Sequence, residues 1–330
     1  MFPLNWNIPF INKNGSRTTL GQITGDVAGI ESDISAINNA LTNVEDSLSH
    51  RNLLDNGWFT INQRGQSSYT GRSGYDDYSV DRWMTSGAVT VNVTNNGITF
   101  PSGEKGFKHK IDNSVLSSLL GKTVTLSAML SDGTIISKSG ALPSTLPSSD
   151  TSYVTLLFTT ASGAASISFR LSSSGGHVLL WGDSASSEIS LRAVKLELGS
   201  VSTLAMDTAP NYATELLKCQ RYFVRLNSNK SQYFTLGNGI AGSASAAFFK
   251  TLLPTTMRSA PSVSGSNDAL LARTGSSSVN ISSPTFSLDA FYGESVSIKI
   301  IDSDSGLTTN ALYLFSYKNT SSYIDLSADL

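Results

Sequence analysis

Few residues of this 330-residue chain have the types and spacing that catalysis or metal binding requires. The histidines, His50, His109 and His177, are scattered without zinc-ligand spacing, and no Gly-x-Ser-x-Gly elbow occurs. The single cysteine, Cys219, has no histidine close to it in sequence, so we expect a buried and inert thiol. These observations predict no catalytic residues and a protein that is not an enzyme.

Two short motifs have the letters of a binding loop but the wrong context. GNGIAG (237–242) matches a dinucleotide-binding loop, yet the residues after it predict a strand where that loop needs a helix. In IDSDSG (301–306), Asp302 and Asp304 precede a glycine as in a calcium loop, but the later glutamate ligand is missing. We expect a solvated turn there, with a metal ion at the two aspartates as the alternative. The sequence therefore predicts no cofactor and no established metal site.

A carboxylate pair for glycoside hydrolysis is also poorly supported. Asp76 and Asp77 are adjacent in the polar stretch GRSGYDDYS. Adjacent residues of a strand point to opposite faces, so this pair cannot flank one glycosidic bond. We interpret both as loop residues.

Composition excludes several classes of partner. The formal net charge is −2, and charged residues make up 15% of the chain, below the ~25% of ordinary soluble domains. No broad basic field is available for nucleic acid or an anionic membrane. The N-terminus has no basic region and no apolar run approaches about 18 residues, so we expect no signal peptide and no membrane insertion. One cysteine allows no disulfide within the chain, so packing or partner chains must stabilise it.

The elements that position these residues begin with one strongly periodic helix. Apolar residues recur at alternating steps of three and four, forming a heptad seam of Leu20, Ile23, Val27, Ile30, Ile34, Ile37, Leu41, Val44 and Leu48. Isoleucine at both a and d positions shifts the preference away from dimers, and we predict a homotrimer. Gly21, Gly25 and Gly29 lie off the seam and weaken the helix. The alternative is a helix packed against its own β domain.

After residue 50 the hydrophobic period changes to two. Val89, Val91 and Val93 alternate with polar residues, and Val124 to Leu130 and Ile167 to Leu171 repeat the pattern between Gly, Pro, Asn and Ser clusters. This predicts an antiparallel β-sandwich of jelly-roll type over residues 51–205.

Several phrases of the middle and later chain resemble modules of bacteriophage tail fibres. NLLDNGWFTINQRG (52–65), YSVDRW (78–83) and LRAVKLELGSVST (191–203) resemble a β-sandwich module of such appendages. APNYATELLKCQRYF (209–223) and LLPTTMRSAPSVS (252–264) resemble the C-terminal module that follows it. These motifs mark architecture and carry no chemistry.

The later phrases also have a physical reading. Pro210 stands near the expected start of a short docking helix in a linker at 206–220, with Leu216, Leu217 and Tyr222 on its apolar side. Asp81 and Arg82 beside Trp83 are expected to form a structural corner. Residues 221–330 predict a second β-sandwich, in which Tyr313, Phe315 and Tyr317 alternate with Leu312 and Leu314. Apolar mass on both faces of that strand favours contact with a neighbouring subunit.

The resemblance implies that the distal domain binds a bacterial surface glycan, a surface protein or lipopolysaccharide. Aromatic rings can stack on sugars beside polar partners, which gives the candidate receptor-binding residues Tyr292, Asp302, Asp304, Tyr317 and Tyr323. A core or interface role is the alternative for each tyrosine.

Taken together, the sequence predicts a mostly β fibre protein. A virion-anchoring segment (1–19) and a trimeric coiled coil (20–50) precede the two antiparallel β-sandwich domains. The expected location is the virion, after synthesis in the host cytoplasm, with the N-terminus contacting tail or capsid proteins. A capsid-attached fibre or a structural appendage without a receptor role is the alternative, and a polysaccharide-degrading tailspike is a third class.

Overall fold

The fold is described from a computed structural model of the full chain. The structure describes residues 9–11, 17–48, 51–100, 106–160, 163–182, 189–227, 235–266, 268, 270–275, 277–302 and 306–329. The predicted anchoring segment lies largely outside these ranges. Within it, β1 (Pro9–Ile11) and β2 (Arg17–Thr19) pair in antiparallel fashion.

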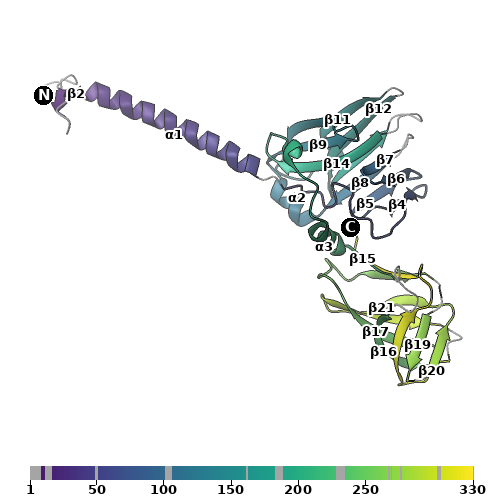
Figure 1. The fold of residues 1–330 in the computed structure, drawn as a ribbon. Coiled ribbons are helices and arrows are strands. Elements are labelled where there is room, and N and C mark those ends of the chain that lie inside the picture. The colour runs from purple at the N-terminus through teal and green to yellow at the C-terminus, as the bar shows by residue number, and fades with distance from the viewer. Residues whose placement is uncertain are drawn as a thin grey trace.

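The longest helix, α1 (Leu20–Leu48), coincides with the predicted heptad seam. It follows β2 directly and stands clear of both β domains (Figure 1). The alternative of a helix packed on its own β domain is therefore not what the structure shows. The oligomeric state remains a prediction.

The middle of the chain folds as two six-stranded antiparallel sheets, which confirms the expected β-sandwich. In spatial order the first sheet is β10 (Ile135–Ala141), β9 (Thr123–Leu130), β14 (Ile189–Leu198), β7 (Gly97–Phe100), β6 (Thr90–Thr94) and β3 (Ser68–Thr70). The second is β11 (Thr151–Thr160), β12 (Gly163–Ser172), β13 (Gly175–Gly182), β8 (Gly106–Ile111), β5 (Trp83–Ser86) and β4 (Asp76–Tyr78). Asp76 and Asp77, which we interpreted as loop residues, therefore lie in a strand that pairs with β5. The finer expectation of a jelly roll stays a prediction.

The alternating residues predicted from the sequence form the core between these sheets. Val124, Leu126 and Ala128 of β9 are fully buried, and Ile167, Phe169 and Leu171 of β12 belong to the same cluster. The apolar face of each strand is thus buried, which stabilises the fold by about 25 cal/mol per Å² of apolar area removed from water. In β9, Thr125 and Ser127 on the other face are buried as well.

Three short helical segments flank the sandwich. α2 (Asn113–Leu119) is capped by the Asp112 carboxylate, which accepts from the Ser114 backbone N–H. The 3₁₀ turn η1 (Leu204–Met206) leads to α3 (Tyr212–Gln220), which Asn211 caps at the Thr214 N–H.

The apolar side that we predicted for α3 is partly wrong. Leu217 is 47% exposed, and the buried residues of the helix are Glu215 and Cys219. Glu215 is buried because its carboxylate accepts from the Asn56 backbone N–H and pairs with Lys218. Polar contacts therefore dock α3 where leucines were expected.

The C-terminal part has a second core between two antiparallel sheets. The smaller sheet is β15 (Phe223–Asn227), β24 (Tyr323–Ser327) and β18 (Ser262–Gly265). The larger is β20 (Ser277–Ile281), β19 (Leu270–Thr274), β23 (Leu312–Tyr317), β16 (Thr235–Ser243), β17 (Ala246–Leu252), β22 (Ser295–Ile301) and β21 (Thr285–Phe291). GNGIAG lies within β16, so it is strand and not a nucleotide loop.

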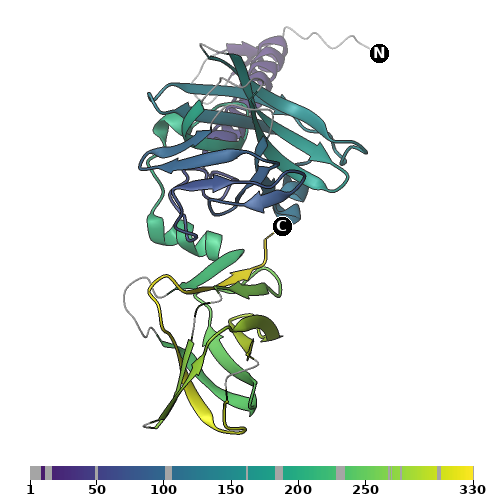
Figure 2. The same ribbon diagram turned by 90° about the vertical axis from the view of Figure 1, so that its right-hand side faces the viewer.

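The small sheet joins the two β domains. Figures 1 and 2 show β15 leaving α3 beside the sandwich, and the chain end after β24 returning to the same place. The remaining strands of the C-terminal domain extend away from the sandwich (Figure 2).

Candidate functional site

The seam of α1 is the first candidate site, because its apolar side chains are uncovered. The exposed fractions are 40% for Ile23, 47% for Val27, 57% for Ile30, 52% for Ile34 and 64% for Ile37. A continuous stripe of exposed β-branched residues marks an interaction surface.

The side chains of the other seam residues, Leu20, Leu41, Val44 and Leu48, lie outside the described part of the chain. Within the described part of the helix, the exposed seam extends from Ile23 to Ile37.

Two of the predicted receptor-binding residues lie in the protein interior. Tyr317 is 1% exposed, and its hydroxyl donates to the Leu226 carbonyl oxygen at 2.9 Å. Burial raises its pKa. Asp302 is 5% exposed, and its carboxylate accepts from the Ser282 backbone N–H at 2.9 Å. Both side chains hold the domain together, so neither presents a face to a receptor.

The remaining candidates are not brought together either. Tyr292 is 63% exposed on the turn between β21 and β22, with Lys250 Nζ 4.7 Å from its ring centroid. Tyr323 lies under the Arg225 guanidinium, 3.9 Å from its ring centroid, at the junction between the domains. Asp304 lies outside the described residues. The structure therefore leaves Tyr292 alone as an exposed aromatic of this set.

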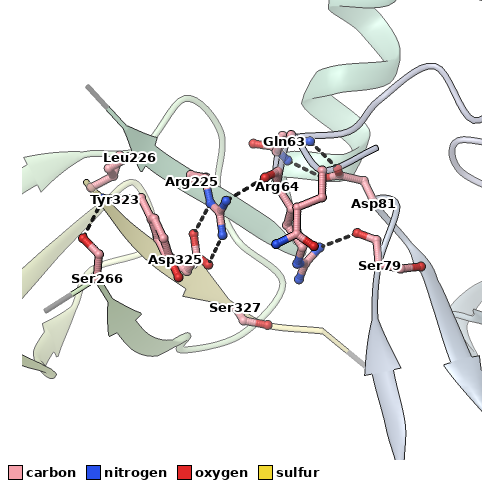
Figure 3. Close-up of polar contacts among 12 residues, drawn as sticks. Gln63, Arg64, Ser79, Asp81, Arg225, Leu226, Ser266, Tyr323, Asp325 and Ser327 are labelled. Atoms are coloured by element: carbon pink, nitrogen blue, oxygen red, sulfur yellow. Dashed lines mark hydrogen bonds and ion pairs between the residues drawn. The ribbon is translucent and has the colours of Figure 1, made fainter. Parts of the chain in front are cut away.

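The junction of the two β domains gathers the sequence phrases that resemble fibre modules. Residues from 52–65, 78–83 and 209–223 meet there at the small sheet (Figure 3). Five residues make most of these contacts, and we call them the polar junction cluster: Gln63, Arg64, Asp81, Arg225 and Asp325.

Arg225 is the centre of the cluster. Its Nε and Nη2 each donate to one oxygen of Asp325 at 2.7 Å, and its Nη1 donates to the Arg64 carbonyl oxygen at 2.8 Å (Figure 3). A guanidinium is suited to this because its fixed fork matches a carboxylate and leaves donors for a third group. One side chain thus joins the C-terminal domain to the sandwich.

Arg64 belongs to the sandwich and contacts the C-terminal domain through its side chain. Its guanidinium carbon stacks 3.6 Å from the centroid of the Phe223 ring, and its Nη2 pairs with Asp329 at 3.3 Å. Its Nη1 donates to the Ser79 carbonyl oxygen at 3.4 Å (Figure 3). The arginine therefore joins β15, the chain end and the sandwich.

Gln63 and Asp81 complete the cluster. The Asp81 carboxylate accepts from the Gln63 backbone N–H at 2.7 Å and from its Nε2 at 2.5 Å (Figure 3). The same Nε2 donates to the Phe223 carbonyl oxygen at 2.8 Å. Burial raises the pKa of Asp81 to about 6, because removing the ionised carboxylate from water outweighs these hydrogen bonds.

The expected corner at Asp81–Arg82–Trp83 lies beside this cluster. Arg82 has a φ of 69° and stacks 3.4 Å from the centroid of the Tyr222 ring, while its Nη2 donates to the Lys110 carbonyl oxygen. Trp83 Nε1 donates to the Asn56 carbonyl oxygen at 3.1 Å. The motif residues therefore shape and join the domains.

Cys219 and His109 are buried nearby. Burial raises the pKa of the Cys219 thiol well above its usual value, so the thiolate form is disfavoured. Burial and the neighbouring Arg82 hold the pKa of His109 well below its usual range. Neither side chain reaches solvent, which fits the inert thiol that the sequence predicted.

Sequence reasoning missed Arg225, Asp325 and Asp329. The Arg225–Asp325 pair spans 100 positions and the Arg64–Asp329 pair spans 265, so no local spacing indicates either contact. The one available signal was the density of motif residues on both sides of the junction.

Among the residues that the structure describes, no group of three or more His, Cys, Asp or Glu side chains is placed to hold a metal ion. No helix in that part of the chain is long and apolar enough to cross a membrane.

No protein-family profile matches the chain, and no curated protein matches it. Among solved structures, the N-terminal CBM22-1–CBM22-2 tandem domain of Paenibacillus barcinonensis Xyn10C has 10% identity, with 79% of this chain and 100% of that chain covered, at a TM-score of 0.18. A mutant of Bacillus subtilis oxalate decarboxylase has 9% identity, with 82% and 76% covered, at a TM-score of 0.14. At these TM-scores neither likeness indicates a shared fold or function.

Proposed function

We propose that this protein is a non-enzymatic, homotrimeric fibre of a bacteriophage virion that attaches the particle to the host cell surface. The exposed heptad seam of α1 supports this most strongly. An isolated rod with β-branched residues at a and d needs copies of itself to cover them, and isoleucine at both positions favours three strands or more over two.

The outer face of the large C-terminal sheet gives independent support for assembly. Ile240 of β16 pairs with Leu312 of β23 and with Phe248 of β17. Leu312 is 71% exposed and Ile240 is 42% exposed, while Tyr313 and Phe315 fill the inner face. An apolar outer face is suited to contact with a neighbouring subunit, as the alternation of β23 predicted.

The polar junction cluster supports a role in which the C-terminal domain keeps a defined position relative to the sandwich. The Arg225 hydrogen bond to the Arg64 carbonyl oxygen, the Gln63 hydrogen bond to the Phe223 carbonyl oxygen and the stacking of Arg64 on Phe223 join the C-terminal domain to the sandwich. A protein that presents a binding domain at a distance from a virion needs such a joint.

A structural appendage without a receptor role is the second candidate. The scatter of Tyr292, Asp302, Tyr317 and Tyr323 over separate places favours it, because these residues build no common site. A polysaccharide-degrading tailspike has less support, since all the described sheets are antiparallel and none forms a long parallel β-helix.

The test is binding of fluorescently labelled full-length protein to a panel of bacterial strains. The fibre proposal predicts saturable binding to some strains and none to others. Absence of binding to every strain, including strains that support growth of the source phage, would favour the structural appendage.

A further inference from the structure

A groove on the β-sandwich domain is unused by the assembly and junction described above. It consists of two clefts that share the wall formed by Trp58. One has a volume of about 580 Å³ and lies between Arg51 and α3, and the other has about 330 Å³ and lies beside the β6–β7 turn. Both volumes are in the range of small-molecule sites.

Trp58 supplies an aromatic surface at the centre of this groove. Its side chain is half-buried, and the Arg192 guanidinium carbon lies 5.9 Å from its ring centroid. The segment from Met206 to Pro210 runs along both clefts, and Met206 is 76% exposed. The exposed part of this half-buried ring can stack against the C–H face of a sugar.

The β6–β7 turn holds two amide side chains at the edge of the smaller cleft. Thr94 Oγ1 accepts from the Asn96 backbone N–H and donates to the Gly97 carbonyl oxygen at 3.1 Å. Gly97 has a φ of 129°, and a Cβ there would lie 2.0 Å from the Leu191 carbonyl oxygen, so the position requires glycine. The turn is therefore fixed in place.

The amides on this turn are uncommitted. Within the described part of the chain, the side chains of Asn95 and Asn96 make no hydrogen bond, and both residues are exposed. Each amide offers both a donor and an acceptor, which is what adjacent sugar hydroxyls pair with. The backbone places these groups on the same cleft as Trp58.

The charges in the larger cleft are balanced. Lys195 binds the Asp207 carboxylate at 2.6 Å, and Lys218 binds the Glu215 carboxylate at 2.8 Å. A polyanion would meet these acids, and a cationic ligand would meet Arg51 and Lys218 there and Arg192 in the smaller cleft. The lining therefore favours a neutral, hydroxyl-rich ligand.

We propose that the groove around Trp58 binds a short neutral oligosaccharide, stacked on Trp58 and hydrogen-bonded by Asn95 and Asn96. Saccharide binding at this site specifies a ligand class for the proposed attachment function. Only the biological role of the site rests on that function. It also moves the glycan contact from the C-terminal domain to the sandwich domain.

The experiment is an array of neutral and acidic oligosaccharides probed with labelled full-length protein, followed by calorimetric titration of the tightest neutral probe. The variants are Trp58→Ala and the double variant Asn95→Ala/Asn96→Ala, which changes only exposed turn residues. The control is Trp181→Ala, since Trp181 is 41% exposed on β13 and does not line the groove.

We expect at least one neutral probe to bind, with affinity at least about tenfold weaker in both groove variants and unchanged in the control, as for loss of ~1.4 kcal/mol. Three results would overturn the assignment: no neutral probe binds, only acidic probes bind, or the groove variants bind like wild type. If the protein is a trimer and attaches to cells but binds no neutral saccharide, the groove assignment is wrong and the proposed function is still supported. A monomer that binds the neutral probe would contradict the trimer alone.

Discussion

At the scale of single residues, the protein depends on a few arginines that each satisfy several partners. Arg225 binds both Asp325 oxygens, the Arg64 carbonyl oxygen and the Tyr323 ring at once. Because these contacts are largely shielded from water, loss of one partner leaves a charge without compensation.

Replacing Asp325 with Asn should lower the free energy of unfolding by about 2–3 kcal/mol, since Arg225 would keep its buried charge and lose the bidentate pair. Chemical denaturation followed by fluorescence measures this change. The matched control is Asp77→Asn, which breaks a bidentate pair with the 71%-exposed Arg72 and should cost far less. Equal costs for the two variants would contradict a special role for the junction.

Asp81 should make stability depend on pH in the acidic range. Its folded-state pKa of about 6 lies above the unfolded value of 3.8, so the folded protein binds more protons between about pH 4 and pH 6. Stability therefore falls as the pH rises through this window, by about 2–3 kcal/mol at ~1.4 kcal/mol per pKa unit.

Unfolding experiments between pH 4 and pH 7 on wild type and Asp81→Asn test this slope. In the Asp81→Asn variant, this decrease in stability with rising pH should be absent, because the amide does not titrate. The control Asp77→Asn removes a carboxyl whose pKa the Arg72 hydrogen bond lowers, so its effect should have the opposite sign. A wild-type slope that persists in Asp81→Asn would show that other groups produce it.

At the scale of elements, local pattern decided what could be predicted. The heptad seam and the alternating strands were readable because their periods are local, and α1, β9 and β12 form where expected. The docking of α3 was misread because Glu215, a charged residue, takes the buried position through contacts with distant Asn56. The junction could not be predicted for the same reason, since its partners are 100 or more positions apart in sequence, as in the Arg225–Asp325 and Arg225–Arg64 contacts.

Replacing Ile30, Ile34 and Ile37 with Asn should weaken oligomerisation, because amides at a and d would lose apolar packing. Analytical ultracentrifugation over a concentration series measures the shift toward monomer. The control variant Ser32→Asn/Ala36→Asn places the same residue type off the seam and should leave assembly unchanged. Equal assembly of all three proteins would show that the β domains hold the copies together.

Replacing Gly25 and Gly29 with Ala should stabilise α1 by about 1 kcal/mol per position and chain. A methyl group at either position meets no atom within 4 Å, and both lie off the seam. Thermal melting of the helical circular dichroism signal measures the gain. A lower melting temperature would show that a partner packs against the glycines.

At the scale of the whole molecule, three features support the proposed fibre function. The exposed apolar seam of α1 needs further copies of the chain to cover it. The Arg225 contacts join the C-terminal domain to the sandwich. The polar groove beside Trp58 is large enough for a ligand. The sequence predicted the helix and the sandwich. Its receptor candidates fall in the core, at the junction and on one turn, because their exposure depends on partners far away in sequence, such as Leu226 for Tyr317 and Ser282 for Asp302.

The most direct test of the central claim is the mass of the purified full-length protein by multi-angle light scattering at micromolar concentration. We predict particles of three times the 35.0 kDa chain mass. A mass of one chain would contradict the assembly inferred from the seam of α1, and a mass of two chains would contradict the trimer that isoleucine at a and d favours.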